Sequence, residues 1–127
     1  MPDFDLAIRG ARDLPFIGIA DGRISAFSEG SAREEIDASN LFVLPGVIDA
    51  HVHFNEPGRT EWEGIATGSR ACAVGGTTTF FDMPLNAHPP TIDAASFDEK
   101  RAAAARSVVD FALWGGLIPG NVEHLEA

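Results

Sequence analysis

The sequence predicts an α/β protein in which a small β-rich module precedes strand–helix units of a parallel sheet. Two observations lead to this prediction. Polar and apolar residues alternate in short segments over the first 45 residues. After the Pro45-Gly46 pair, strand-like segments alternate with segments of helical periodicity, which is typical of a parallel sheet. We therefore expect two domains, residues 1–45 and residues 46–127.

The first region is expected to consist of short strands. Phe4, Leu6 and Ile8 alternate with other residues, which would give a strand one apolar face. Asp21-Gly22 stands between two strand-like segments, and this pair favours a two-residue hairpin turn. The polar segment 31–40 is expected to be a turn-rich connection. Strands are expected at residues 4–9, 16–20, 23–27 and 41–44.

In the second region, helix-start signals separate the expected strands. Thr60 and Glu63 have the spacing of a capping box, and so do Ser96 and Glu99. Asn121 is of the residue type that starts a further helix. Strands are expected at residues 47–54, 77–82 and 108–114, and helices at residues 60–74, at 96–105 and after Asn121.

Two kinds of residue in this region are expected to serve packing. The aromatic side chains of Trp62, Phe80, Phe81 and Trp114 are expected to fill the layer between sheet and helices. Gly64 and Gly68 lie inside an expected helix, where each glycine costs about 1 kcal/mol relative to alanine. Close helix–strand contacts would explain why glycines stand at these two positions.

The charge balance of the chain indicates which classes of partner are not expected. The chain has 9 Lys and Arg residues against 19 Asp and Glu residues, a formal net charge of −10. Nucleic acids and anionic membranes attract clusters of Lys and Arg, so neither is expected as a partner. The first residues lack the apolar run of a signal peptide, and the one cysteine, Cys72, rules out an internal disulfide. These observations favour a cytoplasmic protein.

The segment around His51 carries the strongest candidate site. Successive side chains of a strand point to opposite faces, so Asp49, His51 and His53 share one face. Two imidazoles about 6.6 Å apart along a strand can converge on one metal ion. The alternative is that this face is simply the polar side of a half-buried strand. If both faces are covered, as in most parallel sheets, the histidines need a partner, and a metal ion would supply one.

Three motifs resemble one enzyme family. The run LPGVIDAHVHF at residues 44–54 resembles the amidohydrolase superfamily, in the branch of cyclic amidohydrolases that contains dihydroorotases, hydantoinases, dihydropyrimidinases and allantoinases. The runs HFNEPGRTEWEG at residues 53–64 and GGTTTFFDMPLN at residues 75–86 are most similar to the allantoinase group of that branch. The resemblance covers the whole chain, but only the front part of a family member.

The resemblance implies a fold that this chain begins rather than completes. Family members have a TIM-like (β/α)₈ barrel for metal-dependent hydrolysis, preceded by part of a small β-sandwich domain. A full barrel needs about 250 residues. Residues 1–45 would therefore be part of the composite β-sandwich, and residues 46–127 the first βα units of an incomplete barrel. We expect the chain to be truncated and inactive alone.

The resemblance also implies a metal centre. His51 and His53 match the two histidines that bind the more buried of two divalent metal ions, usually zinc. A carboxylated lysine that bridges the metals, two more histidines and an aspartate that acts as general base are expected downstream, so no catalytic residue is assigned in this segment. Lys100, His88 and His124 do not match those ligands in position.

Two asparagines are candidates for substrate binding. Asn55 stands where dihydroorotases carry an arginine that binds the substrate carboxylate, and a neutral amide suits an uncharged ring. Asn86 follows an expected strand end, where barrel enzymes bind substrate. The alternative for each is an ordinary turn residue.

The function implied is hydrolysis of a cyclic amide, the hydantoin ring of allantoin to allantoate in purine degradation. A hydantoinase, dihydropyrimidinase or dihydroorotase is the alternative within enzymes. A non-catalytic homologue or an inactive fragment is the alternative outside them. The expected partner is a small cyclic ureide, and a homo-oligomer is expected at full length.

Overall fold

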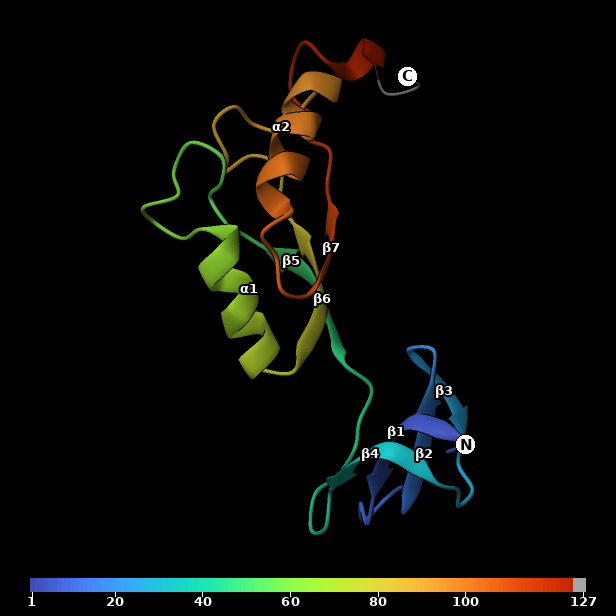
Figure 1. Cartoon of the computed structure of the whole chain (residues 1–127). Coiled ribbons are helices and arrows are strands. Elements are labelled where there is room, and N and C mark those ends of the chain that lie inside the picture. Colours follow the sequence, from blue (N-terminus) through green and yellow to red (C-terminus); the bar gives the residue numbers. More distant parts are fainter. Residues whose placement is uncertain (125–127) are drawn as a thin grey trace. The chain divides into compact units, whose positions relative to one another are not determined.

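The chain folds into two compact units. The structure is a computed structural model that describes residues 1–124. The first unit covers Met1–Pro45 and is built from strands alone, whereas the second begins at Gly46 and combines three strands with two α-helices (Figure 1). The predicted α/β class is therefore confirmed.

The first unit is a four-stranded sheet in the order β3-β2-β1-β4. Asp21 and Gly22 both have positive φ, at 52° and 70°, which is the backbone of the hairpin turn that their sequence predicts. The strand bounds are β1 at Phe4–Arg9, β2 at Phe16–Ala20, β3 at Arg23–Ala26 and β4 at Ala32–Asp37.

Two expectations for the first unit are wrong. The segment expected to be a turn-rich connection contains β4, which pairs in parallel with β1 so that Leu6 lies opposite Glu34. β4 is an exposed edge strand held by its backbone ladder, which is why it lacks an apolar pattern. The expected strand at residues 41–44 belongs to neither sheet. Its amides bond outside any ladder: Leu41 N–H donates to Ala38 O at 2.9 Å and Val43 N–H to Asp13 Oδ1 at 3.0 Å.

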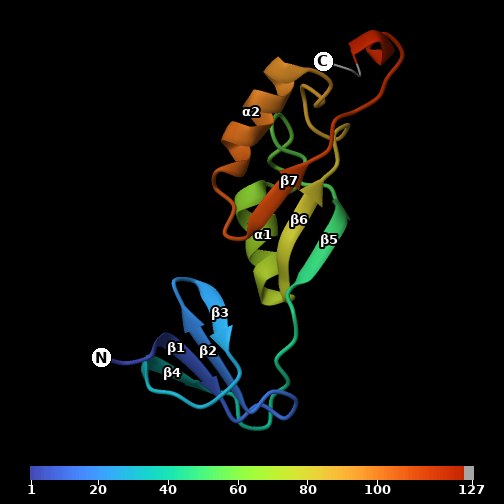
Figure 2. The ribbon, with the colours of Figure 1, turned by 90° about the vertical axis from the view of Figure 1, so that its right-hand side faces the viewer.

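The second unit is a parallel sheet in the order β5-β6-β7, with strands at Val47–Val52, Thr77–Asp82 and Asp110–Leu113. Helix α1 at Ile65–Val74 connects the first two strands, and α2 at Ala94–Ala104 connects the last two. The helices contact each other and lie along one face of the sheet (Figures 1 and 2). β6 has the expected bounds, whereas β5 ends at Val52, two residues earlier than expected, and β7 is shorter than expected at both ends.

The core lies between this sheet and its helices. Phe54, Ile65, Phe80 and Ala104 are buried together, and the Phe54 and Phe80 rings meet edge to face with centroids 4.8 Å apart. Gly68 of α1 lies under the Phe54 ring, and a Cβ atom there would come within 2.3 Å of it. The close contact expected at Gly68 is found, with Phe54 just after the end of β5, whereas Gly64 lies outside the helix as its N-cap.

Both α-helices begin at other residues than expected. α1 begins five residues after Thr60, with Gly64 as N-cap and no capping side chain of its own. α2 is capped by Asp93, whose carboxylate accepts from Ser96 N–H at 2.8 Å, so Ser96 is the third helical residue rather than the cap. Within the described residues, no helix is long and apolar enough to cross a membrane.

Asn121 is followed by a short 3₁₀ helix, Val122–His124. Its side chain points back along the chain, accepting from Ile118 N–H at 2.9 Å and donating to Gly116 O at 2.7 Å and Ile92 O at 3.1 Å. Asn121 therefore joins the loops that follow β6 and β7.

Candidate functional site

His51, which lies in β5, and His53, which directly follows the end of that strand, come together as the alternation of side chains along an extended segment predicts. Val52 and Phe54 pack into the core on the helix side, so His51 and His53 lie on the opposite face. Their Nε2 atoms are 3.1 Å apart, and the ring planes meet at 64°. Both side chains are exposed, so the expectation that this face is buried is wrong for the chain described. The sheet face opposite the helices is open.

The donor geometry of this pair fits a metal ion. Two Nε2 atoms bound to one tetrahedral zinc at 2.0–2.1 Å would lie about 3.3 Å apart. The observed separation of 3.1 Å differs from that value by a few tenths of an ångström. In the metal-free chain the same contact is an imidazole–imidazole hydrogen bond, in which one ring donates and the other accepts. No group of three or more His, Cys, Asp or Glu side chains among residues 1–124 is arranged around a common point for a metal.

Asp49 acts on the backbone of this strand. Its Oδ1 atom accepts from the His51 backbone N–H at 3.1 Å. The expectation that Asp49 orients the surroundings of the histidines agrees with this contact. Cys72 is not a ready metal ligand: burial raises the pKa of its thiol, and the charge of Asp49 raises that pKa further. The thiol therefore stays protonated, whereas a metal needs the thiolate.

Asn55 and Asn86 also meet. Asn86 Nδ2 donates to Asn55 Oδ1 at 3.4 Å, although the two residues are 31 positions apart in sequence. Asn55 follows β5 and is buried, and Asn86 lies in the loop after β6. Asn55 also takes part in a turn, which was the alternative role considered for it, because its backbone carbonyl accepts from Arg59 N–H at 3.0 Å. The structure thus brings together the two candidate substrate residues at the carboxyl ends of adjacent parallel strands.

Glu56 was not singled out in the sequence, yet it organises the loop that leaves β5. It is 4% exposed, and its Oε2 atom accepts from Ile65 N–H at 2.8 Å, which satisfies an amide in the first turn of α1. Its Oε1 atom forms an ion pair with Arg106. The carboxylate of Glu56, in the loop before α1, therefore caps this helix, whereas the sequence predicted Thr60 as its cap.

A second buried carboxylate, that of Asp82, lies at the end of β6 and was also missed. Its Oδ1 atom accepts from Phe54 N–H at 2.9 Å, and its Oδ2 atom lies 2.9 Å from Lys100 Nζ. Lys100 also donates to Met83 O at 2.7 Å. Both side chains of the ion pair are 1% exposed. The signal available in the sequence was an ionisable residue at the end of an apolar strand, together with the one lysine of the chain.

The aromatic residues divide between core and surface. Phe80 is fully buried, as expected, and Phe81 is half-buried. Trp114 is 46% exposed and Trp62 is 68% exposed, so the expectation of core positions is wrong for both tryptophans. Trp62 precedes α1 and contacts the Arg59 guanidinium, and Trp114 donates from Nε1 to Ala50 O at 3.1 Å.

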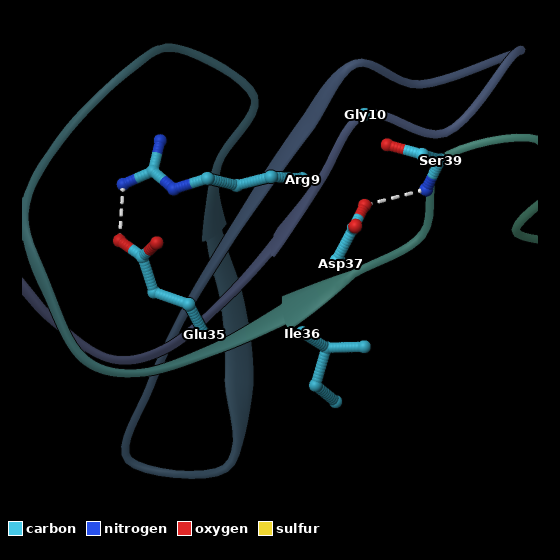
Figure 3. A pocket seen from close by; sticks show the side chains of 6 residues that line it. All are labelled: Arg9, Gly10, Glu35, Ile36, Asp37 and Ser39. Carbon is cyan, nitrogen blue, oxygen red and sulfur yellow. Dashed lines mark hydrogen bonds and ion pairs between the residues drawn. The ribbon is translucent and has the colours of Figure 1, made fainter.

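The first unit has a hollow of its own, of about 340 Å³, lined by Arg9, Gly10, Glu35, Ile36, Asp37 and Ser39 (Figure 3). Its charged groups are already paired. Arg9 donates to Glu35 at 2.7 Å, which lowers the pKa of Glu35 and raises that of Arg9. Ser39 donates to Asp37 and lowers the pKa of that carboxyl group. Within this hollow no charged side chain is left to select a ligand.

Comparisons with known proteins agree on one family. The pattern of the Amidohydrolase family matches residues 42–126. An allantoinase from Rubrobacter xylanophilus is 60% identical over 136 residues, which cover 99% of this chain and 30% of the relative. An allantoinase from Solibacter usitatus is 62% identical over 112 residues, covering 86% of this chain and 24% of the relative.

Among solved structures, an L-hydantoinase (dihydropyrimidinase) from Arthrobacter aurescens matches with a TM-score of 0.76 and 34% identity. The match covers 94% of this chain and 29% of that one. The chain therefore spans 24% to 30% of the length of the relatives it matches here.

Proposed function

The chain belongs to the amidohydrolase family, and on this premise we propose that it serves a metal-dependent enzyme that opens the hydantoin ring of allantoin. In this reaction water adds to a ring amide. A C–O bond forms at the carbonyl carbon, the C–N bond breaks, and the nitrogen leaves with a proton to give allantoate. The observation that carries the proposal is the 60% identity over 99% of the chain to an allantoinase.

His51 and His53 are the residues that would hold a metal ion, one of two divalent ions that we propose to be zinc. Their Nε2 atoms supply two neutral donors on one side of β5. A bound divalent metal lowers the pKa of water towards neutrality and polarises a carbonyl group. Asp49 holds the backbone from which His51 projects.

Asn55 and Asn86 are proposed to bind the substrate ring. Together their amides offer donors and acceptors that match the N–H and C=O groups of a ureide, and neither carries a charge. The contact between them supports a shared pocket wall. We expect the remaining metal ligands and a general-base aspartate to come from downstream sequence, as the resemblance implies.

We further propose that residues 46–127 are the first βα units of a (β/α)₈ barrel and that residues 1–45 are part of a β-sandwich. The likeness to the hydantoinase structure supports this proposal. The cytoplasmic location and the homo-oligomeric state stay predictions.

The metal histidines are tested by His51→Ala and His53→Ala in the protein at the length of its relatives. We expect each variant to lose turnover of allantoin by more than a hundredfold and to bind less zinc, because a hydrolytic metal needs fixed ligands. Metal analysis and kcat/KM measure both effects. His88→Ala, a loop histidine exposed to solvent, is the matched control. Full zinc content together with near-normal activity in either variant would contradict the assignment.

Substrate choice is tested by kcat/KM for allantoin, hydantoin, dihydrouracil and dihydroorotate. Allantoin is expected to be preferred. The structural likeness to an L-hydantoinase (dihydropyrimidinase) favours a second candidate, which a preference for hydantoin or dihydrouracil would support. Asn55→Arg is expected to shift preference towards the anionic dihydroorotate by roughly tenfold to a hundredfold, because a charged hydrogen bond is worth about 1.5–3 kcal/mol. If the unmutated protein prefers dihydroorotate, the argument from a neutral pocket is wrong.

A further inference from the structure

β5 ends at Val52, before the residues that we assign to the site. The sheet ladder between β5 and β6 closes with Met83 N–H donating to Val52 O at 2.9 Å. His53 follows directly, and Asn55 comes two residues later. Residues beyond the end of a ladder are usually free to move. Some other contact must therefore fix the direction in which His53 leaves the strand.

The carboxylate of Asp82 supplies that contact. Its Oδ1 atom accepts from Phe54 N–H at 2.9 Å and so extends the pairing by one step, with a side chain in place of a backbone carbonyl. His53 is thereby held on both sides, through Val52 O and through Phe54 N–H. The backbone of Asp82 is itself fixed, because its carbonyl accepts from Trp114 N–H at 3.1 Å.

Lys100 completes the arrangement. Its Nζ atom lies 2.9 Å from Asp82 Oδ2, and the side chains of both residues are 1% exposed. The same Nζ donates to Met83 O at 2.7 Å, at the start of the loop that carries Asn86. One ion pair anchored on α2 thus holds both the exit from β5 and the exit from β6.

We propose that Asp82 and Lys100 are positioning residues for this site. Through the buried ion pair, they set the direction of His53 towards His51 and the distance between the loops of Asn55 and Asn86. The inference rests on the proposed function in one respect, that His53 is a metal ligand. Groups that orient a metal ligand commonly affect metal affinity by tenfold to a hundredfold.

Two double variants separate positioning from structural support. Asp82→Leu with Lys100→Met replaces the pair by apolar groups of similar size, which avoids an unpaired buried charge but leaves Phe54 N–H without an acceptor. Asp82→Asn with Lys100→Met restores an acceptor at the same place. Arg101→Met, which removes an exposed ion pair with Asp98 on the same helix, is the control.

The measurements are made on the protein at the length of its relatives, with Zn²⁺ as the probe in competition with a chelating dye. The Leu/Met variant is expected to bind Zn²⁺ tenfold to a hundredfold more weakly than the unmutated protein, and Arg101→Met within about threefold of it. The Asn/Met variant keeps an acceptor for Phe54 N–H but loses the contacts of Lys100, so its zinc affinity is expected to lie between these two. In the metal-free protein, the nuclear Overhauser contact between the two imidazoles should weaken most in the Leu/Met variant. Unchanged zinc affinity in a folded Leu/Met variant would overturn the proposal.

A measurement on the unmutated protein tests the proposal without depending on whether a variant folds. Phe54 N–H is expected to exchange with solvent as slowly as the amides of β6, although Phe54 lies beyond the end of β5. Exchange as fast as in an exposed loop would overturn the proposal. If the unmutated protein binds no Zn²⁺, the metal assignment fails, while the imidazole contact and the exchange of Phe54 still decide whether Asp82 positions this segment.

Discussion

The two units of the chain use charge in different ways. In the first unit, the Arg9–Glu35 pair lies at the surface, with side chains 35% and 51% exposed. In the second, the Lys100–Asp82 pair is 1% exposed on both sides, and Glu56 is 4% exposed. The buried pair and Glu56 hold loops that leave the carboxyl ends of strands, while Arg9–Glu35 joins two strands of a sheet that is already paired through its backbone.

The difference shows which unit uses buried charged groups to fix the geometry of its loops. A surface pair is screened by water and changes stability little, whereas a buried charge must be paired to be tolerated at all. The second unit accepts buried carboxylates at the edge that carries the candidate site. In the first unit, the ion pairs that the structure describes lie at the surface.

The largest expected effect comes from breaking the buried pair on one side only. Lys100→Met in the intact protein would leave the Asp82 carboxylate buried and uncompensated, and we expect a loss of about 3–5 kcal/mol in the free energy of unfolding. Arg9→Met is the matched change in the first unit and is expected to alter the unfolding midpoint little. Denaturant unfolding of both variants measures the difference. Equal losses would remove the contrast between the two units.

A smaller effect is expected from two glycines that each lie under a phenylalanine ring. A Cβ atom at Gly68 would come within 2.3 Å of the Phe54 ring, and one at Gly18 within 2.8 Å of the Phe4 ring. Phe54 is buried and cannot move away, while Phe4 is only half-buried and can turn towards solvent.

Gly68→Ala is therefore expected to lose up to about 2 kcal/mol, since overpacking costs about 1–3 kcal/mol and the helix gains about 1 kcal/mol from alanine. Gly18→Ala is expected to lose less. Thermal unfolding of both variants tests the order, and a larger loss at Gly18 would show that the first unit is the more tightly packed one.

The smallest effect is a pH-dependent one at the start of α2. Hydrogen bonds from the backbone and side chain of Ser96 lower the pKa of Asp93 below its usual value of 3.8. A carboxyl group with a lowered folded pKa stabilises the protein above its unfolded pKa, and this contribution is lost as the pH falls through the folded pKa.

Asp93→Ala is therefore expected to lower the melting temperature near neutral pH, and the gap to the unmutated protein should narrow below about pH 3.8. Asp93→Asn, which caps without a charge, should keep its contribution in acid. A gap that stays constant with pH would mean that the charge of Asp93 plays no part.

Local patterns predicted much of this structure. The Asp21-Gly22 turn, the strands β5 and β6 and the close contact at Gly68 depend on neighbouring residues or on strict alternation, and the sequence displays both. The meeting of His51 with His53 followed from the two-residue repeat of a strand.

Contacts made across long stretches of sequence could not be predicted in this way. β4 forms because β1 offers it a ladder 28 residues away, and its own residues carry no apolar repeat. The same is true of Asp82 and Lys100, whose roles depend on a meeting of β6 with α2. In each case the deciding partner is distant in the sequence, so no local pattern records it.

The capping of α1 by Glu56 has an evolutionary consequence. Surface loops usually tolerate insertions and deletions, because the entropy cost of closing a loop changes only slowly with its length. Here the side chain of Glu56 reaches Ile65 N–H, nine positions further along the chain, so the length of the segment between them is fixed. One residue more or less would move the carboxylate away from the helix start and leave the buried Ile65 N–H without its acceptor. Related sequences should therefore vary in composition along this loop while keeping its length.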